Sequence, residues 1–447
     1  MIPPERAIQQ NDPPSDPLAV EPRWKMWGCL ALLMVALLIV VAPRISLSRW
    51  EVIRHMNAAF DEAMQWRDGK LYLSDAAPIW EAPAVDGRKY NVVGHVFVLL
   101  SLVGVWLSEL TGAPPGQFYP PYYILMLAAP VPLVAFGVFR LQTRSAAWGA
   151  VLAGYFIAGT CMRPVLWHCR GSSIYYINHV IAATGLLIFA ADMLGRRRVW
   201  PAAIGLILAA WSRQMTCLYA LPFLWLTWTA CRSPRGNPPS AIGIESAFRE
   251  ITPAGRSVRT SYVKFFAALG VVAVIGLYPM AMSYAKLGNP LDSGYPGMYV
   301  GRTDKIALDA QSCFWGTRWF PRHFKSMNLT LPTPDIRENT IYFDNTDRDG
   351  GSIWFTTPLL LAVFATARRW WRDPARRALM LSSLLVIFGL WGYHTTGSHE
   401  CGYYRYALDF IPIWFAVIAP YVTTPRAAPW TLACLAWSTF YFFMLLP

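Results

Sequence analysis

Repeated apolar runs, each long enough to cross a bilayer, constrain this chain more than any other feature of its sequence. The hydrocarbon core of a membrane is about 30 Å thick, so a crossing helix needs roughly 17–25 mostly apolar residues. The chain is 55% hydrophobic and only 15% charged, whereas charged residues make up about 25% of a typical soluble protein. Eleven runs are predicted to cross, near residues 27–43, 121–140, 147–162, 174–194, 199–212, 216–231, 263–284, 353–368, 378–395, 407–423 and 428–446.

These runs predict an all-α polytopic membrane protein, a bundle of about eleven transmembrane helices with additional interfacial or re-entrant helices. Residues 1–25 are polar and rich in proline, and they predict a disordered cytoplasmic tail ahead of a transmembrane domain over residues 26–447. The first run, "CLALLMVALLIVVA" from Cys29, has no small-residue cleavage site after it. It is therefore predicted to be an uncleaved signal anchor.

The basic residues predict which face each loop occupies. A formal net charge of +13 would suit a nucleic-acid-binding protein, but much of this charge lies in short loops between apolar runs, where it sets orientation. Nucleic acid is therefore not an expected partner. The charge predicts a cytoplasmic N-terminus and cytoplasmic loops at "RLQTR" (140–144), "GRRR" (195–198) and "RRWWRDPARR" (368–377).

Residues 92–110, "VVGHVFVLLSLVGVWLSEL", are long enough to cross but carry His95 and Glu109. A full crossing would move "RLQTR" and "GRRR" to the outer face, so an interfacial or re-entrant segment is predicted. The polar residues then gather on the outer face, in a first loop over 44–120, a long ordered loop over 285–352, and a short one over 395–406.

The eight cysteines form no CxxC or Cys/His ligand pattern, so no structural metal site is predicted. A disulfide between Cys313 and Cys401 stays open.

The stretch "HMNAAFDEAMQWRDG", His55 to Gly69, predicts a short helix at the membrane interface. At 3.6 residues per turn, Phe60 and Met64 fall on one face and Asp61 on another, and the Asp-Gly pair ends the run. A carboxylate beside a low-dielectric surface can act as a general base. The alternative interpretation is a polar face in contact with water.

Several stretches resemble, in order, the landmarks of bacterial GT-C-type glycosyltransferases. These enzymes depend on polyprenyl-phosphate sugars and are distantly similar to protein O-mannosyltransferases and to the aminoarabinose transferase of lipid A. The resemblance covers roughly residues 25–425 and rests on "HMNAAFDEAMQWRDGKLYL", "DGRKYNVVGHVFVLLSLVG", "GLILAAWSRQMTCLYALPFLWL", "YAKLGNPLDSGY" and "GYYRYALDFIPIW".

The resemblance implies a multi-pass enzyme of the bacterial inner membrane that transfers a sugar to an acceptor glycan, lipid or protein on the outer face. His55 and Asp61 keep the family's spacing, which implies Asp61 as the general base, with Glu62 beside it and His55 near the substrate. The resemblance also implies that Tyr295, in "NPLDSGY", borders the substrate site.

Arginines are the candidate ligands for the donor phosphate, because guanidinium groups stay charged and fork onto phosphate oxygens. They are Arg405, which resembles the family's Arg-Tyr, and Arg213, Arg163 and Arg170. The alternative for each is contact with membrane lipid headgroups. His399 and Glu400 are candidates for binding a sugar hydroxyl or a divalent cation, or else a solvated pair.

Two other classes of protein would also fit these features. A transporter or flippase of lipid-linked or amphiphilic substrates would use many spans and a charged residue such as Arg213, although such proteins often carry paired internal repeats, which this sequence lacks. A non-catalytic scaffold of envelope assembly would tolerate the loss of Asp61. The sequence identifies neither the sugar nor the acceptor.

Overall fold

The chain is mostly helical. The computed structural model describes residues 21–41, 58–75, 82–112, 128–169, 174–195, 198–232, 258–337, 340–344, 351–397 and 403–444. The α-helices are α1 (Arg23–Val41), α2 (Ala58–Arg67), α3 (His95–Thr111), α6 (Pro130–Thr143), α7 (Ala146–Ala158), α8 (Met162–Cys169), α9 (Ile174–Leu194), α10 (Val199–Ser212), α11 (Ala220–Arg232), α12 (Val258–Leu287), α13 (Lys305–Ser312), α14 (Phe320–Asn328), α15 (Ile353–Thr356), α16 (Ala362–Ala365), α17 (Ala367–Arg372), α18 (Pro374–Trp391), α19 (Ile411–Val422) and α20 (Ala428–Met444). The 3-10 segments are η3 (Gln214–Tyr219), η5 (Pro296–Tyr299), η6 (Thr317–Trp319), η7 (Pro358–Leu361) and η8 (Arg405–Asp409).

Strands form only two small antiparallel hairpins in the described ranges. They pair β1 (Ala84–Val85) with β2 (Arg88–Lys89), and β3 (Thr333–Arg337) with β4 (Thr340–Asp344). In the second hairpin Thr333 lies opposite Asp344 and Arg337 opposite Thr340. The all-α prediction is therefore confirmed.

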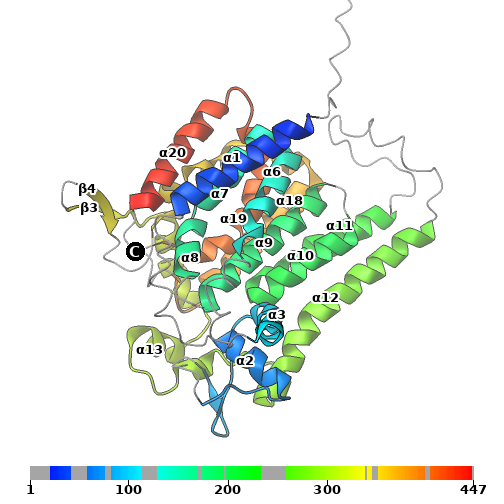
Figure 1. Cartoon of the computed structure of the whole chain (residues 1–447), viewed down its shortest axis with the longest axis vertical. Helices are drawn as coiled ribbons and strands as arrows, with labels where there is room; N and C mark the ends of the chain where they lie inside the picture. The colour runs from blue at the N-terminus through cyan, green and yellow to red at the C-terminus, as the bar shows by residue number, and fades with distance from the viewer. Residues whose placement is uncertain are drawn as a thin grey trace, which may run out of the picture.

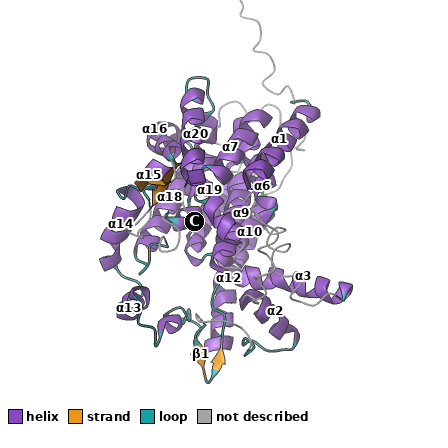
Figure 2. Ribbon diagram, turned by 60° about the vertical axis from the view of Figure 1, so that its left-hand side comes forward, coloured by secondary structure: helices purple, strands orange, loops and turns teal. Residues whose placement is uncertain are grey.

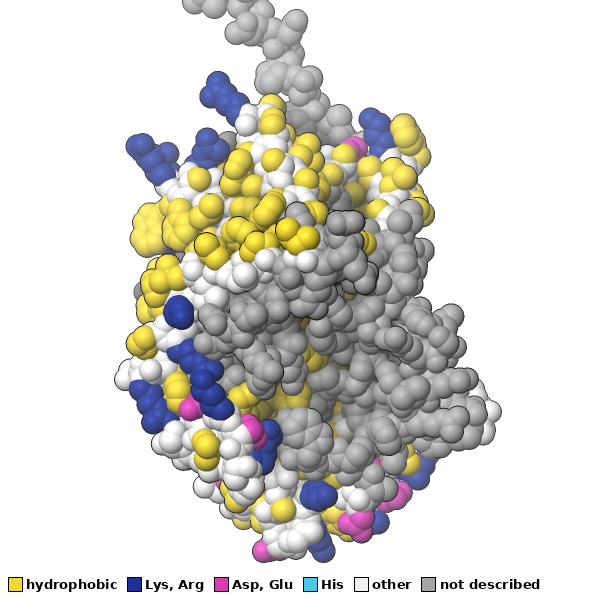
Figure 3. Space-filling model, turned by 90° about the vertical axis from the view of Figure 1, so that its left-hand side faces the viewer, with side chains coloured by type: hydrophobic (Ala, Val, Ile, Leu, Met, Phe, Trp, Pro, Cys, Tyr) yellow, Lys and Arg dark blue, Asp and Glu magenta, His cyan; other side chains and the backbone are white. Residues whose placement is uncertain are grey.

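Three described helices are long and apolar enough to cross a membrane: Tyr175–Leu194, Tyr262–Leu287 and Pro374–Trp391. Four more are apolar but shorter, namely α3, α7, α10 and α19. These helices support membrane association, but they do not confirm the predicted count of about eleven transmembrane helices. Figure 3 shows a belt of apolar side chains across one face of the molecule, with Lys and Arg side chains above and below it.

Of these three helices, α12 is the least buried by the rest of the protein. Only 17% of its apolar stretch is buried in protein, and Figure 1 shows α12 at the edge of the bundle beside α11. Large apolar side chains such as Val263, Phe266 and Leu277 are more than half exposed. An apolar surface of this kind is stable when lipid covers it, and in water it would favour aggregation.

The predicted span over residues 353–368 is the most strongly divided in the structure. Residues 353–368 were predicted to form one helix, but the chain there is divided into α15, η7, α16 and α17. Thr357 leaves the helical region, with φ −137° and ψ 68°, and Pro358 follows it. Proline has no N–H to donate and disfavours helical geometry in the residue before it, so a continuous helix cannot pass this point.

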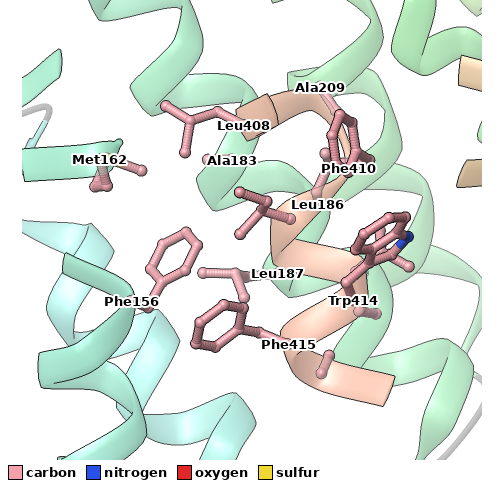
Figure 4. Packing of buried hydrophobic residues seen from close by; sticks show 14 of the residues in the cluster. Phe156, Met162, Ala183, Leu186, Leu187, Ala209, Leu408, Phe410, Trp414 and Phe415 are labelled. Carbon is pink, nitrogen blue, oxygen red and sulfur yellow. The ribbon is translucent and has the colours of Figure 1, made fainter. Parts of the chain in front are cut away.

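The centre of the bundle is α19, in which every residue from Ile411 to Ala419 is buried. A helix that is apolar and buried on all sides belongs to a core. Its Phe415 ring lies 5.9 Å from the ring of Phe156 of α7, and Figure 4 shows both beside Leu187 of α9. This packing joins α7, α9 and α19 into one rigid unit.

Two glycines allow α9 and α10 to touch through their backbones. A Cβ atom on Gly185 would lie 2.5 Å from the carbonyl oxygen of Gly205, and one on Gly205 would lie 2.6 Å from the carbonyl oxygen of Gly185. Small residues at such crossings let membrane helices approach closely and gain van der Waals contact. This close contact fixes α10, whose end carries Arg213.

Contacts between distant segments define the two ends of the bundle. Ala146 donates its N–H to Glu21 at 2.8 Å, and Arg376 donates to Gln142 at 2.9 Å. The start of α1, the α6–α7 connection and the start of α18 therefore share one end, which we call the N-terminal end. The opposite end holds α2, α3 and α13 and is called the α2 end (Figures 1 and 2).

The helix α3, which covers most of the ambiguous residues 92–110, does not run along the bundle. Figure 1 views it nearly along its axis, and Figure 2 shows it extending sideways at the α2 end. It packs against α2 and also touches α9 and α10.

Candidate functional site

Asp61 is buried, and among the described residues Ser74 holds its carboxylate. Its side chain, in α2, is 1% exposed. The backbone N–H of Ser74 donates to Oδ2 at 2.8 Å and the Ser74 hydroxyl donates to Oδ1 at 2.7 Å. The turn after α2 makes this contact possible, because Gly69 takes the left-handed conformation, φ +72°, and reverses the chain. A carboxylate has about four acceptor positions, so each oxygen retains one for a further donor.

Glu62 points into a different set of contacts. Its Oε2 accepts a hydrogen bond from Asn91 Nδ2 at 2.7 Å, and its Oε1 forms an ion pair with Lys286 at the end of α12. Lys286 also donates to the carbonyl oxygen of Asn91 at 2.7 Å. Burial raises the pKa of Glu62, although Lys286 and Asn91 act in the opposite direction. These contacts tie α2 to α12.

The alternative of a water-facing polar face on α2 is wrong for both carboxylates. Glu62 is fully buried and Asp61 nearly so, and Phe60 and Ala63 of the same helix are buried as well. The simple two-faced pattern fails because Ser74, Asn91 and Lys286, all distant from the helix in sequence or beyond its end, contact the two carboxylates. The predicted end of the helix at Asp68-Gly69 is confirmed.

A second polar group lies where α10 ends. Arg213 takes an extended conformation, φ −140° and ψ 101°, and its side chain reaches Asp409. Arg213 Nη2 and Nε donate to Asp409 Oδ2 at 3.1 and 3.3 Å, so two N–H groups of the guanidinium bind the same carboxylate. Asp409 is fully buried, whereas the Arg213 side chain keeps 20% of its surface exposed. On the other side, Nδ1 of the buried His179 lies 3.5 Å from Asp409 Oδ1.

Tyr406 joins this group to Arg405. The Arg213 guanidinium lies 4.9 Å from the centre of the Tyr406 ring, and that of Arg405 lies 5.7 Å from it. Arg405 also lies 5.0 Å from the ring of Tyr176, and His179 stacks on Tyr406 at 5.9 Å. Cation–π contacts of this kind hold both guanidinium groups against the Tyr406 ring.

The segments that carry the two polar groups pack closely against each other. Gly94, at φ +61°, lies so near α9 that a Cβ atom there would overlap the side chain of Asn178. Asn178 precedes His179, and Gly94 follows the segment that contains Asn91. Asp61, Glu62, Arg213 and Asp409 therefore belong to one layer at the α2 end of the bundle. We call these four residues, with Lys286, His179 and Arg405, the polar layer.

The remaining predicted site residues are divided between other places and undescribed segments. Arg163, in α8, lies 5.1 Å from the ring of Phe443 of α20. Tyr295 is half-buried, its ring lies 6.1 Å from that of Phe314, and it lies near enough to Arg213 to interact with its charge. Arg170, His55, His399 and Glu400 lie outside the described residues. No group of three or more His, Cys, Asp or Glu residues that could hold a metal ion occurs within the described ranges. Cys313 is a free thiol, and its candidate partner Cys401 is also outside them.

Sequence reasoning missed five residues of this site: Ser74, Asn91, His179, Lys286 and Asp409. A charged residue within an apolar run is expensive and marks a partner or a function, so Asp409 in "YALDFIPIW" carried a usable signal. Lys286 ends an apolar run, where a lysine normally reaches toward headgroups. Ser74 and Asn91 have no sequence feature that marks them as site residues.

The chain was compared with protein-family models, curated proteins and solved structures, and it matches none of them.

Proposed function

We propose that the chain is a multi-pass membrane glycosyltransferase of the GT-C type, with about eleven transmembrane helices. It would move a sugar from a polyprenyl-phosphate carrier to an envelope acceptor on the extracytoplasmic face. The observation that carries the proposal is the polar layer itself. A buried carboxylate, Asp61, oriented by Ser74, lies at the same end of the bundle as the guanidinium groups of Arg213 and Arg405.

The chemistry follows from these groups. Asp61 takes the proton of the acceptor hydroxyl as that oxygen bonds to the anomeric carbon, and the bond from this carbon to the phosphate oxygen breaks. The polyprenyl phosphate leaves with the electron pair, and guanidinium groups stabilise its negative charge. The anomeric configuration is inverted, since a single displacement occurs.

The arginines divide between two roles. The charge of Arg213 is largely offset by Asp409, so Arg213 is assigned to positioning Tyr406 and the neighbouring backbone. Arg405 is assigned to the donor phosphate, in agreement with its resemblance to the family's Arg-Tyr, and Arg163 and Arg170 remain further candidates. Glu62 is assigned to holding α2, because Lys286 and Asn91 already engage both of its oxygens.

The arrangement of the ends supports the multi-pass topology. Arg376 and Gln142 meet at the N-terminal end, where the positive-inside rule favours the cytoplasm for "RLQTR" and "RRWWRDPARR". The polar layer is at the other end, which is then extracytoplasmic. The sideways direction of α3 (Figure 2) supports an interfacial segment there.

The test uses purified protein in lipid nanodiscs with a panel of polyprenyl-phosphate-linked hexoses and pentoses, and it measures the release of polyprenyl phosphate. Asp61→Asn should lower turnover about 10²–10⁴-fold, the usual range for a general base, with unchanged protein yield. Asp68→Asn is the matched control, because Asp68 is an exposed carboxylate just after the same helix. Wild-type turnover by Asp61→Asn would remove Asp61 from the chemistry. No turnover of any donor by the wild type would favour a transporter or scaffold.

A further inference from the structure

The helix α14 presents two contrasting faces. His323, Ser326 and Met327 are buried. His323 Nδ1 lies 2.9 Å from the Tyr404 hydroxyl oxygen, and Nε2 lies 2.8 Å from the carbonyl oxygen of Tyr393. These two hydrogen bonds fix the rotation of α14 about its axis.

The exposed side chains of α14 and of the residues that flank it are apolar and basic. Phe324 is 46% exposed, and Leu329 and Leu331, just after the helix, are 63% and 64% exposed. Arg318 and Lys325 are exposed on the same segment. We call these five residues the α14 surface. A short amphipathic segment with aromatic and aliphatic side chains beside basic ones is typical of a helix that lies in a membrane interface.

The α14 surface continues the lipid-facing side of a candidate membrane span. Leu384, Leu385 and Phe388 of α18 are each more than 40% exposed, toward the end of that helix. The Phe388 ring lies 5.5 Å from that of Trp391, and the Phe324 ring lies 5.6 Å from that of Trp391. Tryptophan is enriched at the boundary between acyl chains and headgroups. The same apolar surface therefore passes from α18 through Trp391 to α14.

The charges near α14 leave a positive excess. Asp309 is an acidic neighbour, and it is paired with Arg322 at 3.0 Å. Arg318 donates to the Ser312 hydroxyl and lies 4.3 Å from the ring of Trp319, but its side chain remains exposed. Figure 3 shows Lys and Arg side chains below the lower edge of the apolar belt.

We propose that the α14 surface binds the outer leaflet of the membrane. In this arrangement Phe324, Leu329 and Leu331 enter the boundary of the acyl chains, and Arg318 and Lys325 contact the phosphates of anionic phospholipids. The proposal does not depend on the transferase activity. It assigns to the long outer loop a surface that anchors it to the bilayer beside α18.

The first measurement is lipid selectivity. Nanodiscs of phosphatidylcholine mixed with phosphatidylglycerol are extracted with mild detergent, and native mass spectrometry counts the retained phosphatidylglycerol. Each basic residue near an anionic surface contributes about fivefold to lipid binding, so Arg318→Gln with Lys325→Gln should reduce the preference for phosphatidylglycerol more than tenfold. The control pair Lys70→Gln with Lys305→Gln removes two exposed lysines elsewhere in the outer segments and should preserve it.

The second measurement is depth. A fluorophore is attached at Phe324→Cys or, as the control, at Leu308→Cys, since Leu308 is 52% exposed on α13. The background for labelling replaces the accessible cysteines by serine. The label at 324 should be quenched by brominated lipid and protected from iodide, and the label at 308 should behave in the opposite way. Quenching at 324 by iodide alone, or an unchanged phosphatidylglycerol preference in the Arg318→Gln/Lys325→Gln variant, would each overturn the proposal.

Discussion

The ion pair between Glu62 and Lys286 allows the structural role of Glu62 to be tested separately from the proposed catalytic role of Asp61 in the same helix. The perturbation is Glu62→Gln, which keeps an acceptor for Asn91 but removes the negative charge. Lys286 is then left without its opposite charge in a position where its side chain is 2% exposed. Removing one partner of a buried ion pair costs about 3–5 kcal/mol of folding stability, because the remaining charge is uncompensated.

The double variant Glu62→Gln/Lys286→Met gives the internal control. It removes both charges, retains an acceptor for the Asn91 amide, and loses the hydrogen bond from Lys286 to the Asn91 carbonyl. One such bond is worth about 1 kcal/mol, so the double variant should be within about 1–2 kcal/mol of the wild type. If the destabilisations caused by the two single substitutions simply added, the double variant would lose much more stability. The difference between this sum and the measured destabilisation of the double variant is the coupling energy of the pair.

The assay follows unfolding in detergent by tryptophan fluorescence and, in parallel, turnover per folded molecule. Glu62→Gln should unfold much earlier than the wild type and keep its turnover, whereas Asp61→Asn should do the reverse. Glu109→Gln is the matched control, because Glu109 pairs with Arg67 in an exposed contact that contributes about 0–1 kcal/mol. Full stability of Glu62→Gln with turnover reduced by orders of magnitude would refute the structural assignment.

Two further predictions concern the packing that supports the site. Gly185→Ala should destabilise the protein by about 1–3 kcal/mol or more, because its Cβ would meet backbone atoms of α10. The control is Gly276→Ala, where no atom lies within 4 Å of the added Cβ, and it should leave thermal unfolding in detergent unchanged. Equal destabilisation by the two substitutions would contradict the close contact between α9 and α10. Asp409→Asn should lower the folding stability by about 3 kcal/mol, because the charge of Arg213 is then uncompensated. Adding Arg213→Gln should restore most of the lost stability, as measured by the same thermal unfolding. A double variant less stable than Asp409→Asn would show that the loss of the ion pair does not cause the destabilisation.

The sequence predicted the helices best where an apolar run is uninterrupted and bounded by charged residues. The predicted spans 174–194 and 199–212 coincide with α9 and α10, because side-chain hydropathy alone decides such segments. It failed over residues 353–368, where the average hydropathy is high but the backbone at Thr357-Pro358 cannot continue a helix. Hydropathy reports the side chains and is insensitive to that constraint.

The site was predictable only in part, for a related reason. Asp61 and Arg213 stand out locally, as a carboxylate near an apolar run and a charge inside one. Their partners do not, because Asp409 lies 196 residues beyond Arg213 and Lys286 lies far along the chain from Glu62. Such pairs form only when the fold brings the end of α10 to η8 and the end of α12 to α2, and no periodic pattern in the sequence encodes those distances.

The loosely packed helix α12 makes the thickness of the bilayer relevant to the polar layer. Its apolar stretch has 26 residues and spans about 39 Å at 1.5 Å per residue, longer than the roughly 30 Å hydrocarbon core. A helix of excess length tilts, and the tilt changes with the lipid. Because protein covers little of α12, and because Lys286 at its end holds Glu62, a change in the tilt of α12 within a bilayer would be transmitted to the helix that carries Asp61. Short-chain and long-chain lipids would thus set different positions for the same carboxylate.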